Sequence, residues 1–393
     1  MLKKFSGKNV VKAGDLFLTD DIYQDKVGYD WAMSVLSYWR SSHEESLELA
    51  FSLTQKITRK IDVKAVYAKR LKRTPSIVRK LRFVSKDNMK LKTMHDIGGC
   101  RIIVTSTKAL YKVIAELKKQ PEFLKEGGGV RCRDYLSTAK KTGYRSYHLI
   151  GKFKNSTGQL RLIEIQVRTK LQHDWATTLE IVELFTGQAL KSNGGDVVWR
   201  LFFKGISEIL KNIERIPKFT RLSEVDKYSQ FTHYVSQRPK LLESCTQVVS
   251  MSRTISAHQM LHSFTESLKF SHEILKQKPE TSYMLLQINL SDMELTCTDF
   301  KQEQVTLAEQ EYTKAEKKFL DSPQNVTVAL IYSDAIGGIR EAFPNYFADS
   351  HEFLGYLALI STVAMELKTA ALHEGIFVNQ NLALPKGLQV LSE

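Results

Sequence analysis

Residues 145–169 read RSYHLIGKFKNSTGQLRLIEIQVRT. Apolar residues alternate with polar ones on either side of residues 155–158, NSTG, whose Asn and Gly content is typical of a hairpin turn. The stretch therefore predicts two antiparallel strands, at Arg145 to Phe153 and at Gln159 to Thr169.

The second of these strands has an unusual polar face. Glu164, Gln166 and Arg168 alternate with isoleucine and valine, so all three lie on one side of the strand. Three such groups in a row are costly to bury, and we expect their face to line a wet cleft. An edge strand with a solvated face is the alternative.

The residues before this hairpin alternate between helix and strand patterns. We predict a helix over Lys64 to Phe83, a strand over Cys100 to Thr105, a helix over Lys108 to Lys119 and a glycine-rich loop at 127–129. A helical segment, Tyr29 to Lys60, precedes them. The fold class expected here is a mixed α/β module with helices flanking a mixed sheet.

The residues after Thr169 return to helix and then change character. Helices are predicted from just after Thr169 to Glu183, at Val198 to Ile216 and at Lys240 to Gln277. Strands follow at Ser282 to Asn289, Met293 to Phe300 and Val326 to Ser333, with helices at Gln304 to Leu320, Ala335 to Ala342 and His351 to Leu367. We predict a helical segment at 1–60, the α/β module at 61–190, a helical region at 191–277 and a separate α+β domain at 278–393, which could be regulatory.

The charge distribution indicates an anionic partner. The 393 residues carry 57 Lys and Arg against 43 Asp and Glu, a net charge of +14. Residues 61–175 alone hold 27 basic against 9 acidic side chains. Such a surplus favours nucleotide, nucleic acid or anionic lipid as a ligand.

Cysteine spacing and hydropathy exclude other classes of protein. The four cysteines form no CxxC pair, so neither a zinc cage nor a disulfide framework is predicted; they are Cys100, Cys132, Cys245 and Cys297. No secretory signal is predicted at the N-terminus, and the longest apolar run, Phe353 to Met365, is too short to cross a bilayer. We expect a cytoplasmic protein without a membrane segment.

Two acidic residues are candidates for a metal site. Asp96 stands just before Gly98 and Gly99 and an apolar strand, where it can reach a cleft. Mg²⁺ prefers one or two carboxylates together with phosphate oxygens. Asp96 and Glu164 are therefore the predicted metal pair, although either alone could be an ordinary turn or surface acid.

Cations with helical spacing predict a phosphate site. Lys72, Ser76 and Lys80 fall on one stripe of the predicted helix, with Arg70 at its edge. Like charges at this spacing repel unless an anion lies among them, so a polyphosphate is the predicted occupant. A solvated basic face is the alternative.

The loop before the hairpin combines cations with aromatic rings. Arg133 and Lys140 can bind phosphates, Tyr144 can stack on a base and His148 offers two ring nitrogens. Basic residues interleaved with aromatics are typical of sites for nucleotides or single-stranded nucleic acid.

Five motifs within 67–176 resemble, in order and spacing, the synthetase domain of the RelA/SpoT alarmone synthetases. They begin at Arg70 (RLKRTPSI), Asp96 (DIGGCRI), Gly143 (GYRSYH), Glu164 (EIQVRT) and His173 (HDWA). The resemblance covers under a third of the chain.

The resemblance implies a nucleotidyltransferase-like fold that transfers the β,γ-pyrophosphate of ATP to the 3′-hydroxyl of GDP or GTP. Arg70 and Arg101 would sandwich the adenine, Lys72, Ser76 and Lys80 would hold the ATP phosphates, and Asp96 would bind Mg²⁺. On the acceptor side, Glu164 would lie by the metal or accept the hydroxyl proton, and Gln166 and His148 would lie near the sugar or phosphates. Tyr144 would stack on the acceptor base, and Arg133 and Lys140 would bind its phosphates.

Departures from the family pattern leave the acceptor open. Thr142 stands where the family has the asparagine that reads guanine, so the 3′ end of tRNA, the acceptor of some short relatives, is the alternative to GDP or GTP. A non-catalytic nucleotide- or RNA-binding regulator is the third hypothesis. Only some 60 residues precede the module, so we expect no hydrolase activity. No DNA partner is expected, and the helical region 198–277 could support a homo-oligomer.

Overall fold

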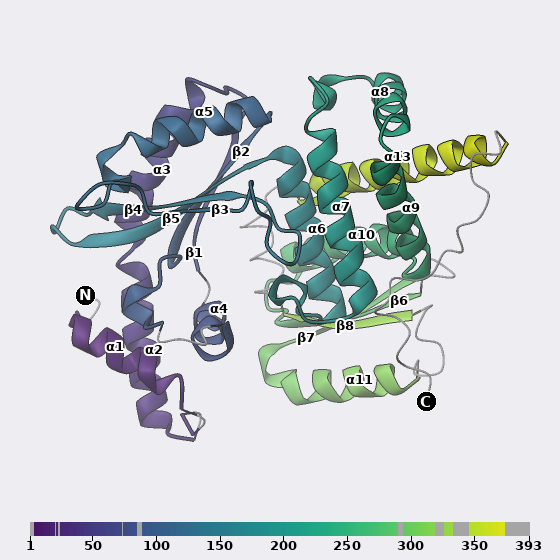
Figure 1. Cartoon of the computed structure of the whole chain (residues 1–393). Coiled ribbons are helices and arrows are strands. Elements are labelled where there is room, and N and C mark those ends of the chain that lie inside the picture. Colours follow the sequence, from purple (N-terminus) through teal and green to yellow (C-terminus); the bar gives the residue numbers. More distant parts are fainter. Residues whose placement is uncertain are drawn as a thin grey trace.

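The structure is a computed structural model that describes residues 4–19, 21–22, 24–72, 74–84, 89–289, 294–318, 326–332 and 346–373. It confirms the mixed α/β fold class. Figure 1 shows a five-stranded sheet with its helices on one side of the molecule, and a helical bundle with a three-stranded sheet on the other.

The elements of the N-terminal half are α1 (Gly7–Leu16), α2 (Lys26–Ser41), α3 (Glu44–Arg59), β1 (Val66–Leu71), α4 (Thr74–Arg79), β2 (Gly98–Val104), α5 (Thr107–Lys118), β3 (Cys132–Asp134), β4 (Tyr147–Lys154) and β5 (Leu160–Thr169). Those of the C-terminal half are α6 (Lys170–Thr186), α7 (Val197–Ile213), α8 (Glu224–Ser236), α9 (Pro239–Thr254), α10 (Ala257–Gln277), β6 (Tyr283–Asn289), β7 (Glu294–Phe300), α11 (Val305–Lys318), β8 (Val326–Tyr332) and α13 (Tyr346–His373).

The larger sheet has one apolar and one polar face. Its strand order is β1-β2-β5-β4-β3, with β2 and β5 parallel and the other neighbours antiparallel. Helices α3 and α5 cover the apolar face, where Ile102, Ile163 and Ile165 are fully buried against residues such as Leu110 and Val113. The opposite face is left for the polar side chains.

The helix predicted over Lys64 to Phe83 is wrong in its first part. Val66–Leu71 is strand β1, paired antiparallel with β2, and the helix α4 begins only at Thr74. The segment is rich in helix formers, but pairing with the edge of β2 decides its structure, since strand formation depends on the available neighbour more than on intrinsic preference.

Other sequence predictions agree with the structure more closely. The hairpin is confirmed as β4 and β5, with Gly158 in the left-handed region at φ +80°. The helix predicted over Lys240 to Gln277 is two helices, α9 and α10, separated at Ser256, which has φ +46°. The helix predicted at Ala335 to Ala342 lies outside the described residues.

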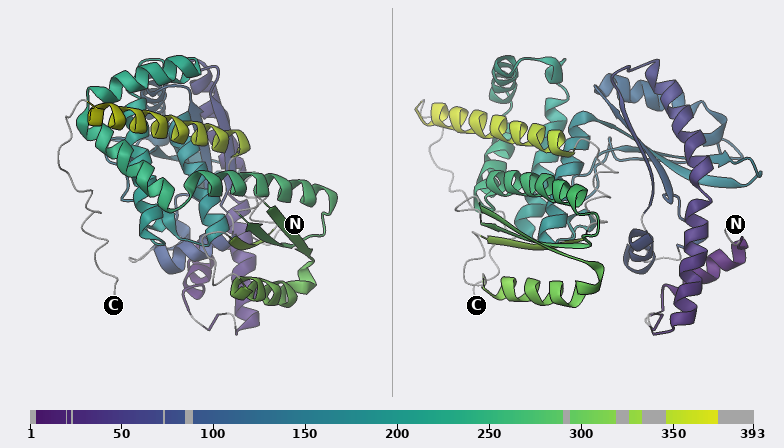
Figure 2. Two further views of the ribbon diagram at one scale, coloured as in Figure 1. Left: turned by 90° about the vertical axis from the view of Figure 1, so that its right-hand side faces the viewer. Right: turned by 180° about the vertical axis from the view of Figure 1, so that it is seen from behind.

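One hydrophobic core extends through the whole C-terminal half. It contains Trp175 of α6, Phe203 of α7, Phe264 of α10, Leu286 of β6 and Phe353 of α13. This core contains residues from both sides of the domain boundaries predicted at 190 and 277. The division into domains stays a prediction. The smaller sheet, in the order β7-β6-β8, lies between this core and α11, as both views in Figure 2 show.

Among the described residues one helical segment, Ser350–Ala371, is long and apolar enough to span a membrane. This is weak evidence, because its side chains Phe353, Leu357, Ile360 and Val363 are buried in the C-terminal core. A buried core helix accounts for the same apolar composition.

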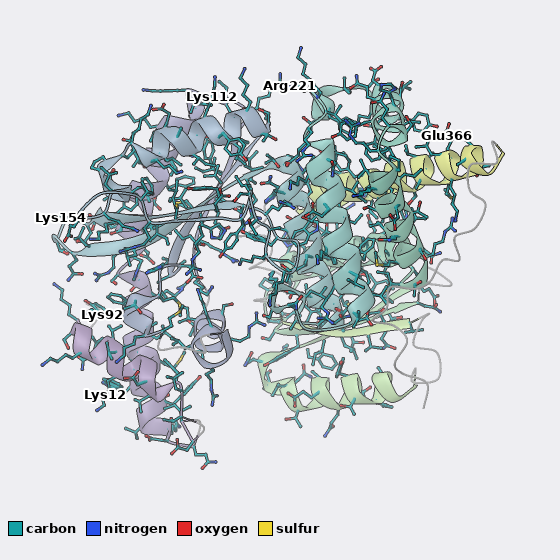
Figure 3. The ribbon with its side chains drawn as sticks, in the orientation of Figure 1. Lys12, Lys92, Lys112, Lys154, Arg221 and Glu366 are labelled. Carbon is teal, nitrogen blue, oxygen red and sulfur yellow. The ribbon has the colours of Figure 1, made fainter. Side chains whose placement is uncertain are left out.

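Many of the surplus basic side chains point into solvent. Lys112 on α5 and Lys154 at the end of β4 extend from the outside of the larger sheet, Lys12 extends from α1, and Lys92 extends from the short helix Leu91–Thr93 (Figure 3). Arg168 is buried instead, on the polar face of the larger sheet.

Candidate active site

The register of the larger sheet brings polar residues from four strands into one row. Arg101 on β2 lies opposite Gln166 on β5, Gln166 opposite His148 on β4, and His148 opposite Arg133 on β3. Residues opposite each other project to the same side of a sheet. The row therefore assembles on the polar face residues that are far apart in the sequence.

A pocket lies over the β1, β2 and β5 end of this row. Arg70 on β1 is the diagonal neighbour of Arg101 on β2. Gly99 lies opposite both Arg70 and Glu164, and it adds no side chain to the pocket floor. The pocket is lined by Ala68, Lys69, Arg70, Lys72, Asp96, Gly99, Cys100, Arg101, Glu164 and Gln166. The predicted metal pair and both arginines predicted to bind adenine thus share one pocket.

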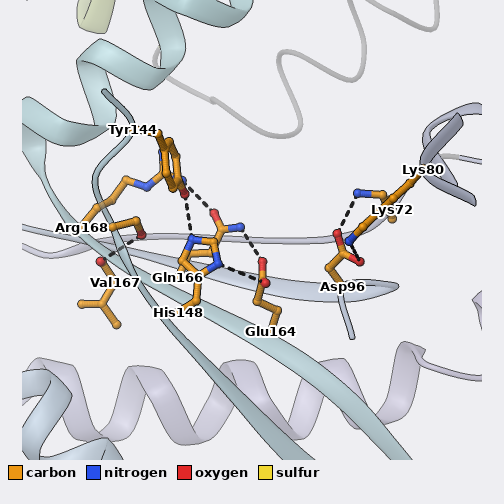
Figure 4. Close-up of polar contacts among 10 residues, drawn as sticks. Lys72, Lys80, Asp96, Tyr144, His148, Glu164, Gln166, Val167 and Arg168 are labelled. Atoms are coloured by element: carbon orange, nitrogen blue, oxygen red, sulfur yellow. Dashed lines mark hydrogen bonds and ion pairs between the residues drawn. The ribbon is translucent and has the colours of Figure 1, made fainter. Parts of the chain in front are cut away.

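Asp96 is held between two lysines. Lys72 Nζ lies 2.9 Å from Asp96 Oδ2, and Lys80 Nζ lies 2.8 Å from Asp96 Oδ1 (Figure 4). Burial alone would raise the pKa of Asp96, but the two lysines hold it below its usual value, and the negative charge of Glu164 opposes them. Burial lowers the pKa of Lys72, and Asp96 offsets this only in part. Burial of the Lys72 ammonium is therefore not fully compensated by Asp96, as expected for a site that receives an anion.

Glu164 belongs to a closed ring of five hydrogen-bonded side chains (Figure 4). Arg168 Nη2 donates to Gln166 Oε1 at 2.8 Å, and Gln166 Nε2 donates to Glu164 Oε1 at 2.7 Å. His148 Nδ1 lies 3.1 Å from Glu164 Oε2, and its Nε2 lies 2.9 Å from Tyr144 Oη. Arg168 Nη2 also donates to Tyr144 Oη at 3.0 Å, which closes the ring.

The ring shifts the pKa of Glu164, His148 and Tyr144. Burial alone would raise the pKa of Glu164, but the charge of His148 and the hydrogen bonds from His148 and Gln166 hold it well below its usual value. The pKa of His148 is raised, because Tyr144 and Glu164 outweigh its burial. Burial would raise the pKa of Tyr144 as well, but the charges of Arg168 and His148 lower it to about 7. Shifts of this kind concentrate at functional sites.

The loop that precedes β4 places a cation against aromatic rings. Lys140 Nζ lies 4.7 Å from the ring centre of Tyr135 and 4.9 Å from that of Tyr144. Thr142 is buried, and its Oγ1 accepts a hydrogen bond from the backbone nitrogen of Tyr144 at 3.4 Å. Arg133 is exposed on the edge strand β3. Of the residues predicted to bind an acceptor, Arg133, Lys140, Tyr144 and His148 therefore lie on β3, β4 and the loop before β4, whereas Gln166 lines the pocket with Asp96.

Helix α7 fixes this loop from the C-terminal half. Ser207 Oγ donates to the carbonyl oxygen of Gly143, and Glu208 forms an ion pair with Arg145. Gly143 has φ +93°, and a Cβ there would lie 3.0 Å from Lys204 Cα. The loop and the helix are thus in backbone contact, which only glycine permits.

Comparison with known proteins identifies the segment that carries the site. Residues 69–181 match a family model described as "Region found in RelA / SpoT proteins". This segment is a RelA/SpoT region. Every residue that the sequence predicted for the site lies within it, from Arg70 to Gln166.

Two curated proteins of Bacillus subtilis resemble the RelA/SpoT region. GTP pyrophosphokinase YjbM is 36% identical over 111 residues, which are 28% of this chain and 51% of that protein. GTP pyrophosphokinase YwaC is 40% identical over 87 residues, 21% of this chain and 40% of that protein. The chain spans about half the length of the curated relatives it matches.

Solved structures resemble a larger part of the chain, at lower identity. The small alarmone synthetase 1 from Bacillus subtilis, bound to its product pppGpp, is 23% identical, with a TM-score of 0.39, over 47% of this chain and 95% of that one. A GTP pyrophosphokinase family protein from Streptococcus pneumoniae is 20% identical, with a TM-score of 0.35, over 49% of this chain and 96% of that one.

Within the RelA/SpoT region two sequence predictions are corrected. The cationic stripe on one helix is wrong: Arg70 lies on β1, Lys72 follows it, and Ser76 lies on α4 without lining the pocket. Arg168 does not line a wet cleft, because its side chain is only 2% exposed. Glu164 and Gln166 on the same strand do line the pocket, as predicted.

Three residues that contact the site were not predicted. Arg40 of α2 donates from Nε to the carbonyl oxygen of Lys72 at 2.9 Å. Glu180 of α6 is paired with Lys191 at 2.8 Å, and the charges of Lys191, Arg70 and Arg101 lower its pKa to about 2. Ser207 of α7 holds the acceptor-side loop. Arg40 and Ser207 come from helices outside the RelA/SpoT region, and no local sequence signal identifies them.

Gly143→Ala tests the contact between the loop and α7. The substitution is expected to cost roughly 2–4 kcal/mol of unfolding free energy, because the added methyl group combines backbone strain with overpacking against α7. Gly158→Ala is the matched control: its φ is +80°, but a Cβ there meets only Lys154 Cε at 3.6 Å among the described residues. Equal effects of the two substitutions in chemical denaturation would contradict the proposed contact.

The ionisation of Tyr144 is open to direct measurement. We expect one tyrosine of the folded protein to form tyrosinate as the pH rises through about 7, far below the usual value of about 10. Because the pKa of Tyr144 is lower in the folded state, its ionisation stabilises the fold most when the pH is above the pKa of the unfolded chain. This contribution disappears as the pH falls through about 7. The measurement is the near-ultraviolet absorption of tyrosinate, with Tyr144→Phe subtracted. The prediction fails if the difference spectrum shows no tyrosine ionising below pH 9.

Proposed function

We propose that this chain is an ATP-dependent pyrophosphokinase that transfers the β,γ-pyrophosphate of ATP to the 3′-hydroxyl of GDP or GTP. The observation that carries the proposal is the shared pocket, in which two carboxylates, Asp96 and Glu164, face Lys72, Arg70 and Arg101. The likeness of residues 69–181 to GTP pyrophosphokinases supports the choice of reaction.

The donor set suits Mg²⁺ brought in with ATP. Asp96 and Glu164 line the same pocket, and both have a pKa below the usual value, so both are ionised at neutral pH. Within the described residues no group of three or more His, Cys, Asp or Glu could hold a metal. Phosphate oxygens would have to complete the coordination, as is common for Mg²⁺. The bound ion would neutralise charge on the transferred group.

Binding of ATP would require the lysines to change partners. Both oxygens of Asp96 are now paired with Lys72 and Lys80. A triphosphate would draw the two ammonium groups to its own oxygens and so release the carboxylate for the metal. We propose that Arg70 and Arg101 then hold the adenine, with Glu180 fixing the two guanidinium groups.

The reaction needs little covalent chemistry from the protein. The 3′-hydroxyl oxygen attacks the β-phosphorus, the bond from that phosphorus to the α,β-bridging oxygen breaks, and AMP leaves. The protein must align the two oxygens and stabilise charge on the non-bridging ones. The strongly lowered pKa of Glu164 makes it a weak proton acceptor, which favours a role beside the metal over that of general base.

We propose that the acceptor binds over the β4 side of the row. Tyr144 would contact the base, His148 and Gln166 the sugar, and Arg133 and Lys140 the phosphates. The inward side chain of Thr142 supports a test of other acceptors, because it bonds to its own loop and does not extend toward a base. We further propose that the enzyme acts in the cytoplasm.

The experiment is a transfer assay with purified full-length protein, Mg²⁺ and ATP carrying a radioactive γ-phosphate. GDP, GTP and bulk tRNA are offered in parallel. The release of AMP is measured together with the transfer of label to each acceptor. Label in a guanine nucleotide with equal AMP supports the proposal. Label on tRNA would show that the proposed acceptor is wrong. Release of ADP in place of AMP would show that the proposed reaction is wrong. No label on any acceptor would overturn the proposal. Incubation with labelled product tests hydrolysis separately.

A further inference from the structure

Arg168 is a buried charge without a carboxylate partner. Its side chain is 2% exposed, and within the described part of the chain no Asp or Glu oxygen lies within 4.0 Å of its guanidinium nitrogens. Its Nε and Nη1 have no hydrogen-bond partner there, while Nη2 makes two bonds. Arg101 adds a like charge nearby. Burying a charge in this way is costly, so stability alone does not explain an arginine at this position.

The guanidinium fixes the direction of the hydrogen bonds on one side of the ring. An arginine can only donate. Since Arg168 Nη2 points at Gln166 Oε1, the amide group of Gln166 must turn its NH₂ toward Glu164 Oε1. The ionised carboxylate of Glu164 can only accept, so Arg168 and Glu164 together hold the amide in this orientation.

The same nitrogen contacts the other side of the ring. Arg168 Nη2 donates to Tyr144 Oη, and this oxygen lies 2.9 Å from His148 Nε2. His148 Nδ1 donates to Glu164 Oε2, because an ionised carboxylate can only accept. Each oxygen of Glu164 therefore receives one hydrogen bond from a side chain that Arg168 contacts directly or through Tyr144.

We propose that Arg168 is a positioning residue, which sets the orientation of Glu164 and of the Tyr144 ring through these two routes. This inference rests on the proposed function for its kinetic part. Arg168 acts on the acceptor side of the site: its partners are Tyr144 and Gln166, whereas Asp96, Lys72 and Lys80 form a separate group of contacts.

Two variants separate the charge of Arg168 from its geometry. Arg168→Met removes both and is expected to lower kcat/KM for the acceptor about ten- to a hundredfold, with a smaller change in the KM of ATP. Arg168→Lys keeps the charge but not the planar fork, and a similar kinetic loss is expected. An equal rise in the KM of ATP for either variant would overturn the assignment to the acceptor side.

Tyrosine ionisation provides a test that requires no activity. Among the described residues, the charged or titratable groups that face Tyr144 are Arg168, His148, Lys140, Arg101 and Tyr135. In Arg168→Met the ionisation of Tyr144 is expected to move from about 7 toward 10, while in Arg168→Lys it stays low. The Tyr144→Phe background identifies the signal. An unchanged ionisation in Arg168→Met overturns the inference, even if no acceptor is ever found.

Thermal unfolding excludes a purely structural role. Because Arg168→Met replaces a buried charge with an apolar side chain of similar length, its melting temperature is expected to stay the same or to rise. A lower melting temperature together with unchanged tyrosine ionisation would mean that Arg168 only supports the fold, and would overturn the proposal.

Discussion

Asp96→Asn is expected to lower kcat/KM for pyrophosphate transfer by about a thousandfold. The asparagine cannot anchor a divalent ion that is worth several kcal/mol of charge stabilisation in the transition state. The pair of lysines that now holds Asp96 at 2.9 and 2.8 Å would be left without a counter-charge. The measurement is the steady-state rate of AMP release at saturating Mg²⁺.

Binding experiments distinguish loss of the metal from loss of the fold in this variant. In the presence of a chelator, Asp96→Asn should bind ATP at least as tightly as the native chain, because Lys72 and Lys80 are free to contact phosphate. Added Mg²⁺ should tighten binding only in the native chain. Glu126→Gln serves as the matched control, since this carboxylate is on the surface, 96% exposed. Full activity of Asp96→Asn would remove Asp96 from the metal site.

Glu164→Gln is expected to lower kcat by about a hundred- to a thousandfold, with a smaller change in the KM of ATP. The amide has the shape of the native side chain but carries no charge. Its NH₂ would face either the NH₂ of Gln166 or the protonated nitrogen of His148, so one hydrogen bond of the ring must break. The measurement is single-turnover transfer with saturating ATP.

Glu116→Gln on the outer surface of α5 is the control for this second substitution. Its carboxylate pairs with Lys119, one turn away, and is 45% exposed. Because the pKa of Glu164 is held well below its usual value, its charge stabilises the fold at neutral pH and this contribution is lost toward acid pH. Glu164→Gln should therefore show a weaker loss of stability on acidification than the native chain. An unchanged kcat would exclude Glu164 from the reaction.

The sequence predicts the pocket well because strand periodicity is a local property. The alternation around Glu164 and Gln166 places both on one face, and the structure puts both in the pocket. The same alternation cannot show that the end of β5 is covered: Arg168 lies on the face of Glu164 and Gln166 but is only 2% exposed, and α6 packs against β5 and β2.

The misassigned β1 illustrates the other limit. Residues 64–72 contain alanine, lysine, arginine and leucine, which all favour helix. The segment is a strand because β2 offers it an antiparallel edge, and only the assembled sheet contains that information. Arg40 and Ser207 likewise reach the site through helix packing, so neither can be found from the RelA/SpoT region alone.

The core of the C-terminal half has a practical consequence for enzymology. Shortening the chain after residue 277 would strip β6, β8 and α13 from the apolar surfaces of α6, α9 and α10, including the stacked rings of Phe185 and Phe264. Such a fragment should aggregate, and a silent assay would then reflect collapse of the scaffold that carries Ser207 and Trp175. A regulatory role for the C-terminal residues is better sought by single surface substitutions in the intact polypeptide.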